Sequence, residues 1–127
     1  MPADKYVLVA EDNDLNFRLA QFILARLGVE VRRATTGDQA LADALADPPA
    51  LIYMDIQLPG IDGLQVTREL RSNPATQHVP IVALTALAMV GDEERAISAG
   101  CNAYLTKPVS PHDLQDMTRR YLMDEAA

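Results

Sequence analysis

The chain has 127 residues, a mass of 13.9 kDa, 49% hydrophobic residues and 23% charged residues, the size and composition of one ordinary globular domain. Its formal net charge of -7 argues against broad binding to nucleic acid phosphates, and its single cysteine, Cys101, cannot form an internal disulfide. No apolar run approaches the length of a membrane span and the first residues do not resemble a secretory signal, so we expect a cytoplasmic protein without membrane insertion.

Short apolar runs alternate along the chain with segments in which apolar residues recur at helical spacing. The runs are typical of strands buried on both faces, and the periodic segments indicate helices. We therefore predict strands at 5–10, 29–34, 50–54, 80–84 and 102–105, and helices at 14–28, from Thr36 to the Pro48-Pro49 pair, 63–72, 92–99 and 111–123.

The first and last predicted helices carry specific expectations. Asp14 is predicted to cap the start of the first helix, and Gly28 to end it. The apolar positions of this helix recur at helical spacing and are Leu15, Leu19, Phe22, Ile23 and Leu27. The strand that follows alternates weakly, so we place it at a sheet edge. The buried face of the last helix is predicted to contain Leu114, Met117, Tyr121 and Leu122.

The alternation of strands and helices predicts an α/β fold with a parallel sheet and helices on both faces. Right-handed crossovers bring the carboxyl ends of all strands to one edge of such a sheet, and ligands bind at this edge. The residues directly after the strands therefore form the candidate site, and they are Glu11, Asp12, Asp55, Thr85 and the Lys107-Pro108 pair.

This candidate site is acidic. If the strand order is 2-1-3-4-5, the first and third strands are neighbours, and Glu11, Asp12 and Asp55 converge. Two carboxylates about 5 Å apart repel by about 3 kcal/mol at an effective dielectric constant of about 20. Lys107 is the one close base among the candidates, so a hard divalent cation would best offset the repulsion. Mg²⁺ fits because it takes one or two carboxylates and keeps several waters.

Other uses of an α/β sheet lack their motifs. The loop after the first strand has no G-x-G-x-x-G, and the chain contains neither a P-loop nor G-x-S-x-G. We expect His78 and His112 to be solvated surface residues and Cys101 to be a small buried hydrophobe. Dinucleotide binding, P-loop nucleotide hydrolysis and serine hydrolysis are therefore not supported.

The acid pair occurs in VLVAEDN, Asp55 in YMDIQLPGIDG, Thr85 in ALTALAM and Lys107 in YLTKP. On these segments the sequence resembles the receiver domain of two-component response regulators, from about Lys5 to Tyr121. The resemblance implies one flavodoxin-like receiver domain over residues 1–127, with its core at about 5–121 and no output domain. A free single-domain regulator is favoured, and a receiver cut from a hybrid histidine kinase is the alternative.

The resemblance also implies a chemistry. Asp55 would accept a phosphoryl group from a histidine kinase or histidine phosphotransfer protein. Asp12, Asp55 and the backbone carbonyl of Gln57 would ligate Mg²⁺, and Glu11 would act through bound water. Lys107 would pair with the phosphoryl oxygens. Such a domain assists its own phosphorylation and dephosphorylation but is not a free-standing enzyme.

The resemblance further implies a conformational switch. Thr85 would bond to the phosphoryl group, and Tyr104 matches the aromatic switch position of the family. The Lys107–Pro108 bond is expected to be cis. The signal would leave through a protein-binding face made by the fourth helix, fifth strand and fifth helix.

Two alternatives use the same residues differently. One is a metal-dependent phosphatase with Asp55 as covalent nucleophile, as in haloacid-dehalogenase-like enzymes. Those enzymes need D-x-D, whereas position 57 is Gln, which removes their general acid. The other is a receiver-like interaction module that is never phosphorylated, against which the complete acid, Thr and Lys set argues.

Overall fold

The computed structural model describes residues 6–86 and 91–122. Its elements follow in the order β1 (Tyr6–Ala10), α1 (Asp14–Arg26), β2 (Glu30–Ala34), α2 (Gly37–Ala46), β3 (Leu51–Asp55), α3 (Gly63–Arg71), β4 (Ile81–Thr85), α4 (Asp92–Ala99), β5 (Ala103–Thr106) and α5 (Pro111–Leu122). All ten predicted elements are present, and their ends differ from the prediction by two residues at most. The predicted end residues Lys5 and Met123 lie outside the described residues.

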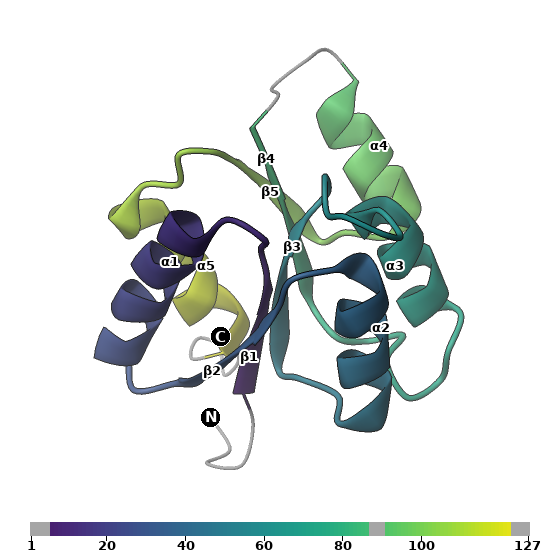
Figure 1. The fold of residues 1–127 in the computed structure, drawn as a ribbon, viewed down its shortest axis with the longest axis horizontal. Helices are drawn as coiled ribbons and strands as arrows, with labels where there is room; N and C mark the ends of the chain where they lie inside the picture. Colours follow the sequence, from purple (N-terminus) through teal and green to yellow (C-terminus); the bar gives the residue numbers. More distant parts are fainter. Residues whose placement is uncertain (1–5, 87–90, 123–127) are drawn as a thin grey trace.

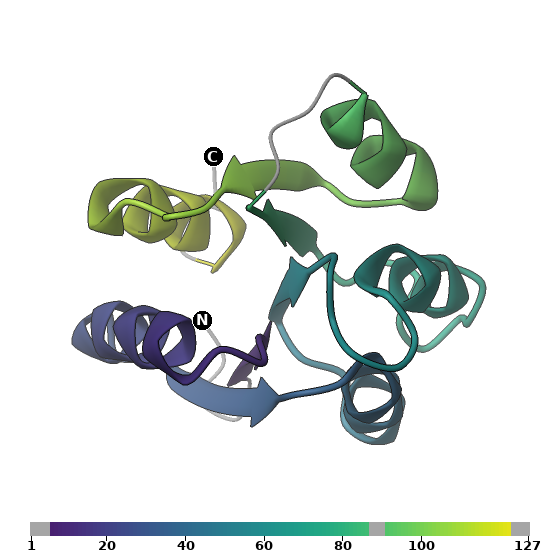
Figure 2. The same cartoon turned by 45° about the horizontal axis from the view of Figure 1, so that its top comes forward.

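The five strands form one parallel sheet in the order β2-β1-β3-β4-β5. Helices α1 and α5 cover one face of the sheet, and α2, α3 and α4 cover the other (Figures 1 and 2). The flavodoxin-like prediction is therefore confirmed. Every residue of β1, β3 and β4 is buried, whereas β2 alternates between exposed and half-buried positions up to its buried last residue, Ala34, and lies at the edge, as its sequence predicted.

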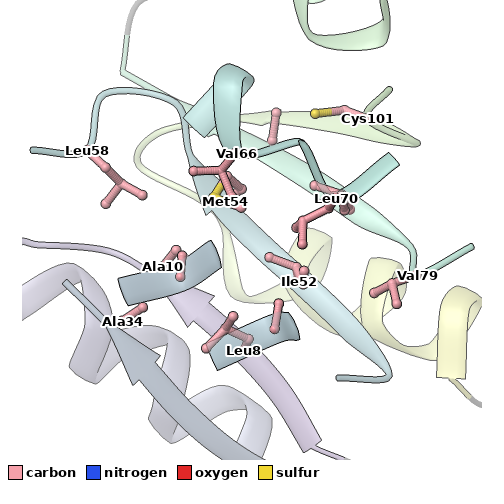
Figure 3. Packing of buried hydrophobic residues seen from close by; sticks show 14 of the residues in the cluster. Leu8, Ala10, Ala34, Ile52, Met54, Leu58, Val66, Leu70, Val79 and Cys101 are labelled. Atoms are coloured by element: carbon pink, nitrogen blue, oxygen red, sulfur yellow. The ribbon is translucent and has the colours of Figure 1, made fainter. Parts of the chain in front are cut away.

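The core is divided by the sheet into two layers. The layer under α2, α3 and α4 contains the side chains of Leu8, Ile52, Met54, Val66 and Leu70 (Figure 3). The layer under α1 and α5 includes Phe17, Leu24, Tyr53 and Leu114. In that layer the buried Tyr53 hydroxyl lies 2.6 Å from Thr118 Oγ1, which satisfies both polar groups. No helix in residues 6–86 and 91–122 is both long and apolar enough to cross a membrane.

The start of α1 differs from the prediction. Asn13, not Asp14, is the N-cap: its backbone is extended, and its side-chain oxygen accepts a 2.9 Å hydrogen bond from the backbone N–H of Asn16. Asp14 is the first helical residue, where its charge interacts favourably with the helix dipole. The segment Asp12-Asn13-Asp14 offers three consecutive capping residues, and spacing alone does not choose among them.

The apolar residues of α1 also differ from the prediction in which of them are buried. Leu15, Leu19 and Phe22 are 65%, 55% and 62% exposed, so they are not part of the core. Of the predicted positions, Ile23 and Leu27 do pack in the core layer, where they are joined by Phe17, Ala20 and Leu24. The helix thus carries two adjacent apolar stripes, of which only one is buried. In α5, Leu114 and Leu122 are buried as predicted, while Met117 and Tyr121 are only partly buried.

Candidate functional site

The predicted site residues meet at the carboxyl edge of the sheet. Ala10 pairs with Met54 in the register of β1 and β3, so the residue that follows each of them, Glu11 or Asp55, reaches the same end of the sheet. Thr85 ends β4 and pairs with Thr106 of β5, which places Lys107 beside them. In contrast, His78 and His112 are exposed, as predicted.

Lys107 joins two of the acids. Its Nζ atom lies 2.6 Å from Glu11 Oε1 and 2.7 Å from Asp55 Oδ2. The Glu11 and Asp55 side chains are only 2% and 7% exposed, and that of Lys107 is 15% exposed. The second carboxylate oxygen of Asp55, Oδ1, accepts a 2.9 Å hydrogen bond from the backbone N–H of Gln57. Asp55 is therefore held at both oxygens.

Burial and charge act against each other in this cluster. Burial raises the pKa of Glu11, and the hydrogen bond from Lys107 opposes this shift only in part. Burial lowers the pKa of Lys107, but its bonds to Asp55 and Glu11 outweigh that effect and raise the pKa above its usual 10.5. Lys107 therefore remains an ammonium at neutral pH, although one cation faces two carboxylates.

A third acid completes a set of oxygen donors. One carboxylate oxygen each from Glu11, Asp12 and Asp55 lie within 4.8 Å of one another. Glu11 and Asp55 are buried and Asp12 is exposed, so the set opens to solvent on the Asp12 side. Hard carboxylate oxygens with space for water are the donor chemistry that Mg²⁺ prefers, and the residues present fit such an ion.

The two predicted switch residues lie on one face of the sheet. Tyr104 pairs with Ala83 of β4, and Thr85 follows Ala83 by two residues, so all three side chains point to the same side. Thr85 is buried, whereas Tyr104 is half-buried against the layer under α2, α3 and α4. The backbone N–H of Lys107 donates a 2.7 Å hydrogen bond to the Thr85 carbonyl. The Lys107–Pro108 peptide bond is cis.

Two neighbours of the site were missing from the sequence prediction. Arg33, in β2, donates from Nε to the Glu11 carbonyl at 3.1 Å. Gly63 begins α3 directly beside Asp55, because a Cβ atom there would lie 2.5 Å from the Asp55 carbonyl oxygen. The register of β1 and β2, which pairs Ala10 with Ala34, could have pointed to Arg33 once the strand order was known. The contact of Gly63 has no sequence signal.

An apolar groove leads away from the site along α1. It has a volume of about 60 Å³ and lies between α1 and the segment that follows β5. Its walls include Glu11 and Lys107 at the acidic end, and Leu19, Pro108 and Val109 farther along. Leu19 also belongs to the exposed apolar stripe of α1, formed with Leu15 and Phe22, so the stripe continues into the mouth of the site.

The sequence comparisons point to one family. Residues 7–119 match the family model of the response regulator receiver domain. The polar-differentiation response regulator DivK of Brucella ovis is 42% identical over 120 residues, which cover 94% of this chain and 98% of that protein.

Solved structures of the same kind have similar folds. The receiver domain of sensor histidine kinase PA1611 from Pseudomonas aeruginosa, solved with a magnesium ion coordinated in its active site cleft, has a TM-score of 0.85 and 38% identity, over 92% of this chain and 96% of that one. The receiver domain of Saccharomyces cerevisiae Ssk1, solved with the histidine phosphotransfer protein Ypd1, has a TM-score of 0.86 and 30% identity, over 100% of this chain and 95% of that one.

Proposed function

Because this chain belongs to the response regulator receiver domain family, we propose that it accepts a phosphoryl group on Asp55 from a phosphohistidine donor in a magnesium-dependent reaction. The observation that carries the proposal is the gathering of Glu11, Asp12, Asp55 and Lys107 at the carboxyl edge of the sheet. In the transfer, an Asp55 oxygen forms a bond to phosphorus while the bond from phosphorus to the donor imidazole breaks.

The charges of the site explain why a cation is needed. A phosphoryl group carries negative charge, and the three acids of the site would repel it. Lys107 supplies one positive charge, which is already shared between Glu11 and Asp55. Bound Mg²⁺ would supply the remaining positive charge that phosphoryl transfer requires.

Each side chain has a distinct part in this proposal. Asp12, Asp55 and the Gln57 carbonyl would hold the metal, and Glu11 would act through bound water. Lys107 Nζ already lies 2.7 Å from Asp55 Oδ2, so its ammonium is placed to pair with a phosphoryl oxygen once Asp55 carries the phosphoryl group as an acyl phosphate. The domain assists its own phosphorylation and dephosphorylation in this way, while the donor supplies the phosphoryl group.

The phosphohistidine donor docks on the exposed stripe Leu15, Leu19 and Phe22 of α1. Three large apolar side chains that are more than half exposed on one helix are typical of a protein-binding surface. The stripe continues through Leu19 into the groove that ends at Glu11 and Lys107, so a protein seated on it reaches Asp55. The occupant is therefore the donor, since its histidine must come within bonding distance of that carboxylate.

Substitution in the stripe separates the two kinds of donor. The double variant Leu19→Ser, Phe22→Ser is expected to slow phosphoryl transfer from a phosphorylated histidine phosphotransfer protein by about tenfold, or about 1.4 kcal/mol. Uptake from acetyl phosphate should be unchanged, because this small donor needs no docking surface. Leu45→Ser is the matched control, since Leu45 is an exposed leucine on α2. Equal losses with both donors, or none with the protein donor, would contradict the docking assignment.

Phosphorylation of Asp55 changes the position of Thr85, and this change alters the position of Tyr104. A phosphoryl oxygen on Asp55 gives the Thr85 hydroxyl a new charge-assisted partner at the end of β4. Movement of Thr85 opens space on the face of the sheet that it shares with Tyr104. A shift of about 1.4 kcal/mol, within reach of one such bond, changes a two-state equilibrium tenfold. The altered surface is that of α4, β5 and α5, which binds the downstream protein.

Titration with Mg²⁺ and then beryllofluoride, a mimic of the phosphoryl group, tests the proposal. We expect Mg²⁺ alone to shift the amide resonances of Asp12 and Gln57 in NMR spectra. Beryllofluoride should then shift those of Thr85 and Tyr104, and only when Mg²⁺ is present. Shifts at Thr85 and Tyr104 without Mg²⁺, or no response to either addition, would contradict the proposed function.

A further inference from the structure

Arg33 contacts three points around the loop that carries the proposed metal ligand Asp12. We call residues 11–13, between β1 and α1, the acid loop. Besides donating from Nε to the Glu11 carbonyl, Arg33 places Nη2 at 2.8 Å from Asp14 Oδ1, just after the loop. Its guanidinium also lies over the ring of Phe17, with 4.8 Å between Cζ and the ring centroid. One side chain of β2 thus spans the end of β1 and the first turns of α1.

The contacts of Arg33 differ in how much they stabilise the acid loop. The Asp14 side chain is 78% exposed. Arg33 Nη2 forms an ion pair with it, but the geometry of this contact is not that of a hydrogen bond. Such an exposed pair contributes little. The bond to the Glu11 carbonyl and the contact with Phe17 are better shielded, because the Arg33 side chain is only 25% exposed. The carbonyl bond is therefore the contact that fixes the loop.

Asp12 depends on this backbone support. Its carboxylate has no hydrogen bond or ion pair with residues 6–86 or 91–122, so its position follows from the backbone on either side. On one side, the Glu11 N–H donates to the Ala34 carbonyl at 2.9 Å and its carbonyl accepts from Arg33. On the other side, the Asn13 N–H donates to Glu11 Oε2 at 3.1 Å.

We propose that Arg33 is a positioning residue that holds the acid loop in its metal-binding conformation, an inference that rests on the proposed magnesium site. Charge and position predict opposite effects of Arg33 on the metal. As a cation beside an acidic site, Arg33 repels Mg²⁺. If charge were its only effect, removing Arg33 would therefore tighten Mg²⁺ binding. As a support of the loop, Arg33 aligns Asp12, so its removal weakens binding. Partners that orient metal ligands change metal affinity by about tenfold or more when they are lost.

The test is a titration with Mg²⁺ alone, followed by NMR. Arg33→Gln is expected to raise the Mg²⁺ dissociation constant by about tenfold. The Asp12 and Asn13 amide resonances should shift before any metal is added, whereas those of β4 and β5 keep their wild-type positions. Arg32→Gln is the matched control, because Arg32 is the adjacent cation of the same strand but pairs with Glu30 and Asp47. It should bind Mg²⁺ as the wild type does.

The outcomes separate this inference from the proposed function. Wild-type or tighter Mg²⁺ binding by Arg33→Gln would overturn the positioning role and leave the metal site intact. Failure of the wild-type chain to bind Mg²⁺ would overturn the metal site itself. If Arg33→Gln does not fold, Arg33→Lys, which keeps the charge but loses the planar guanidinium, should show a smaller loss of affinity. Wild-type affinity in Arg33→Lys would then overturn the role.

Discussion

Replacement of Asp55 by asparagine is expected to abolish phosphoryl uptake from both acetyl phosphate and a phosphohistidine donor. Asparagine keeps the shape of the side chain, but its amide cannot form the acyl phosphate. The 2.6 Å contact between Lys107 and Glu11 does not involve Asp55, so the fold of the site should persist in this variant. Incorporation of radiolabelled phosphate, measured against the wild type, gives the result directly.

Asp62→Asn is the control for Asp55→Asn. Asp62 caps α3 by accepting hydrogen bonds from the backbone N–H groups of Leu64 and Gln65, and asparagine can replace it in that role. The two variants have the same change in charge and lie near each other in the chain. Uptake should therefore persist in Asp62→Asn. Wild-type incorporation in Asp55→Asn would show that another residue is the acceptor.

Replacement of Lys107 by methionine is expected to slow phosphoryl uptake by about a hundredfold. This is the effect of removing one charged hydrogen-bond donor from a site where negative charge develops in the transition state. Mg²⁺ should bind at least as tightly as before, because a neighbouring cation has been removed. The variant would therefore separate stabilisation of the phosphoryl group from metal binding. Initial rates of uptake from acetyl phosphate at saturating Mg²⁺ measure the first effect, and calorimetric titration measures the second.

Arg119→Met, which removes an exposed cation in the last turn of α5, is the control for Lys107→Met and should change neither quantity. A parallel loss of Mg²⁺ affinity in Lys107→Met would contradict the separate role of Lys107.

The raised pKa of Lys107 also determines how the stability of the fold depends on pH. The contribution of the Lys107 ammonium to the free energy of unfolding is fully present below the unfolded-state pKa of about 10.5. It is lost as the pH rises through the higher folded-state pKa. Lys107→Met should remove this part of the alkaline loss of stability.

The strands and the residues of the site followed from the sequence for a physical reason, whereas the strand order was implied by the resemblance to receiver domains. A parallel strand buried on both faces is a short apolar run, and its carboxyl end is marked by the first polar residue after it. Glu11, Asp55 and Lys107 each stand at or next to such a boundary, so the topology alone brings them together.

Other features could not be predicted because they depend on packing. The two apolar stripes of α1 have equivalent spacing, and only the docking of the helix on the sheet decides that Phe17 and Leu24 are buried while Leu15 and Phe22 are exposed. The support of the acid loop by Arg33 depends on the register of β1 and β2, which periodicity does not provide.

If Asp55 is the cation-dependent phosphoryl acceptor, it must carry the label in the wild-type chain, and locating that label there is the most direct test. The chain is incubated with acetyl phosphate, with Mg²⁺ or with a chelator, and the acyl phosphate is trapped by borohydride reduction and located by peptide mass spectrometry. We expect modification at Asp55 with Mg²⁺ and none with the chelator. Modification at a different residue, or equal modification at Asp55 when the cation is removed, would contradict it.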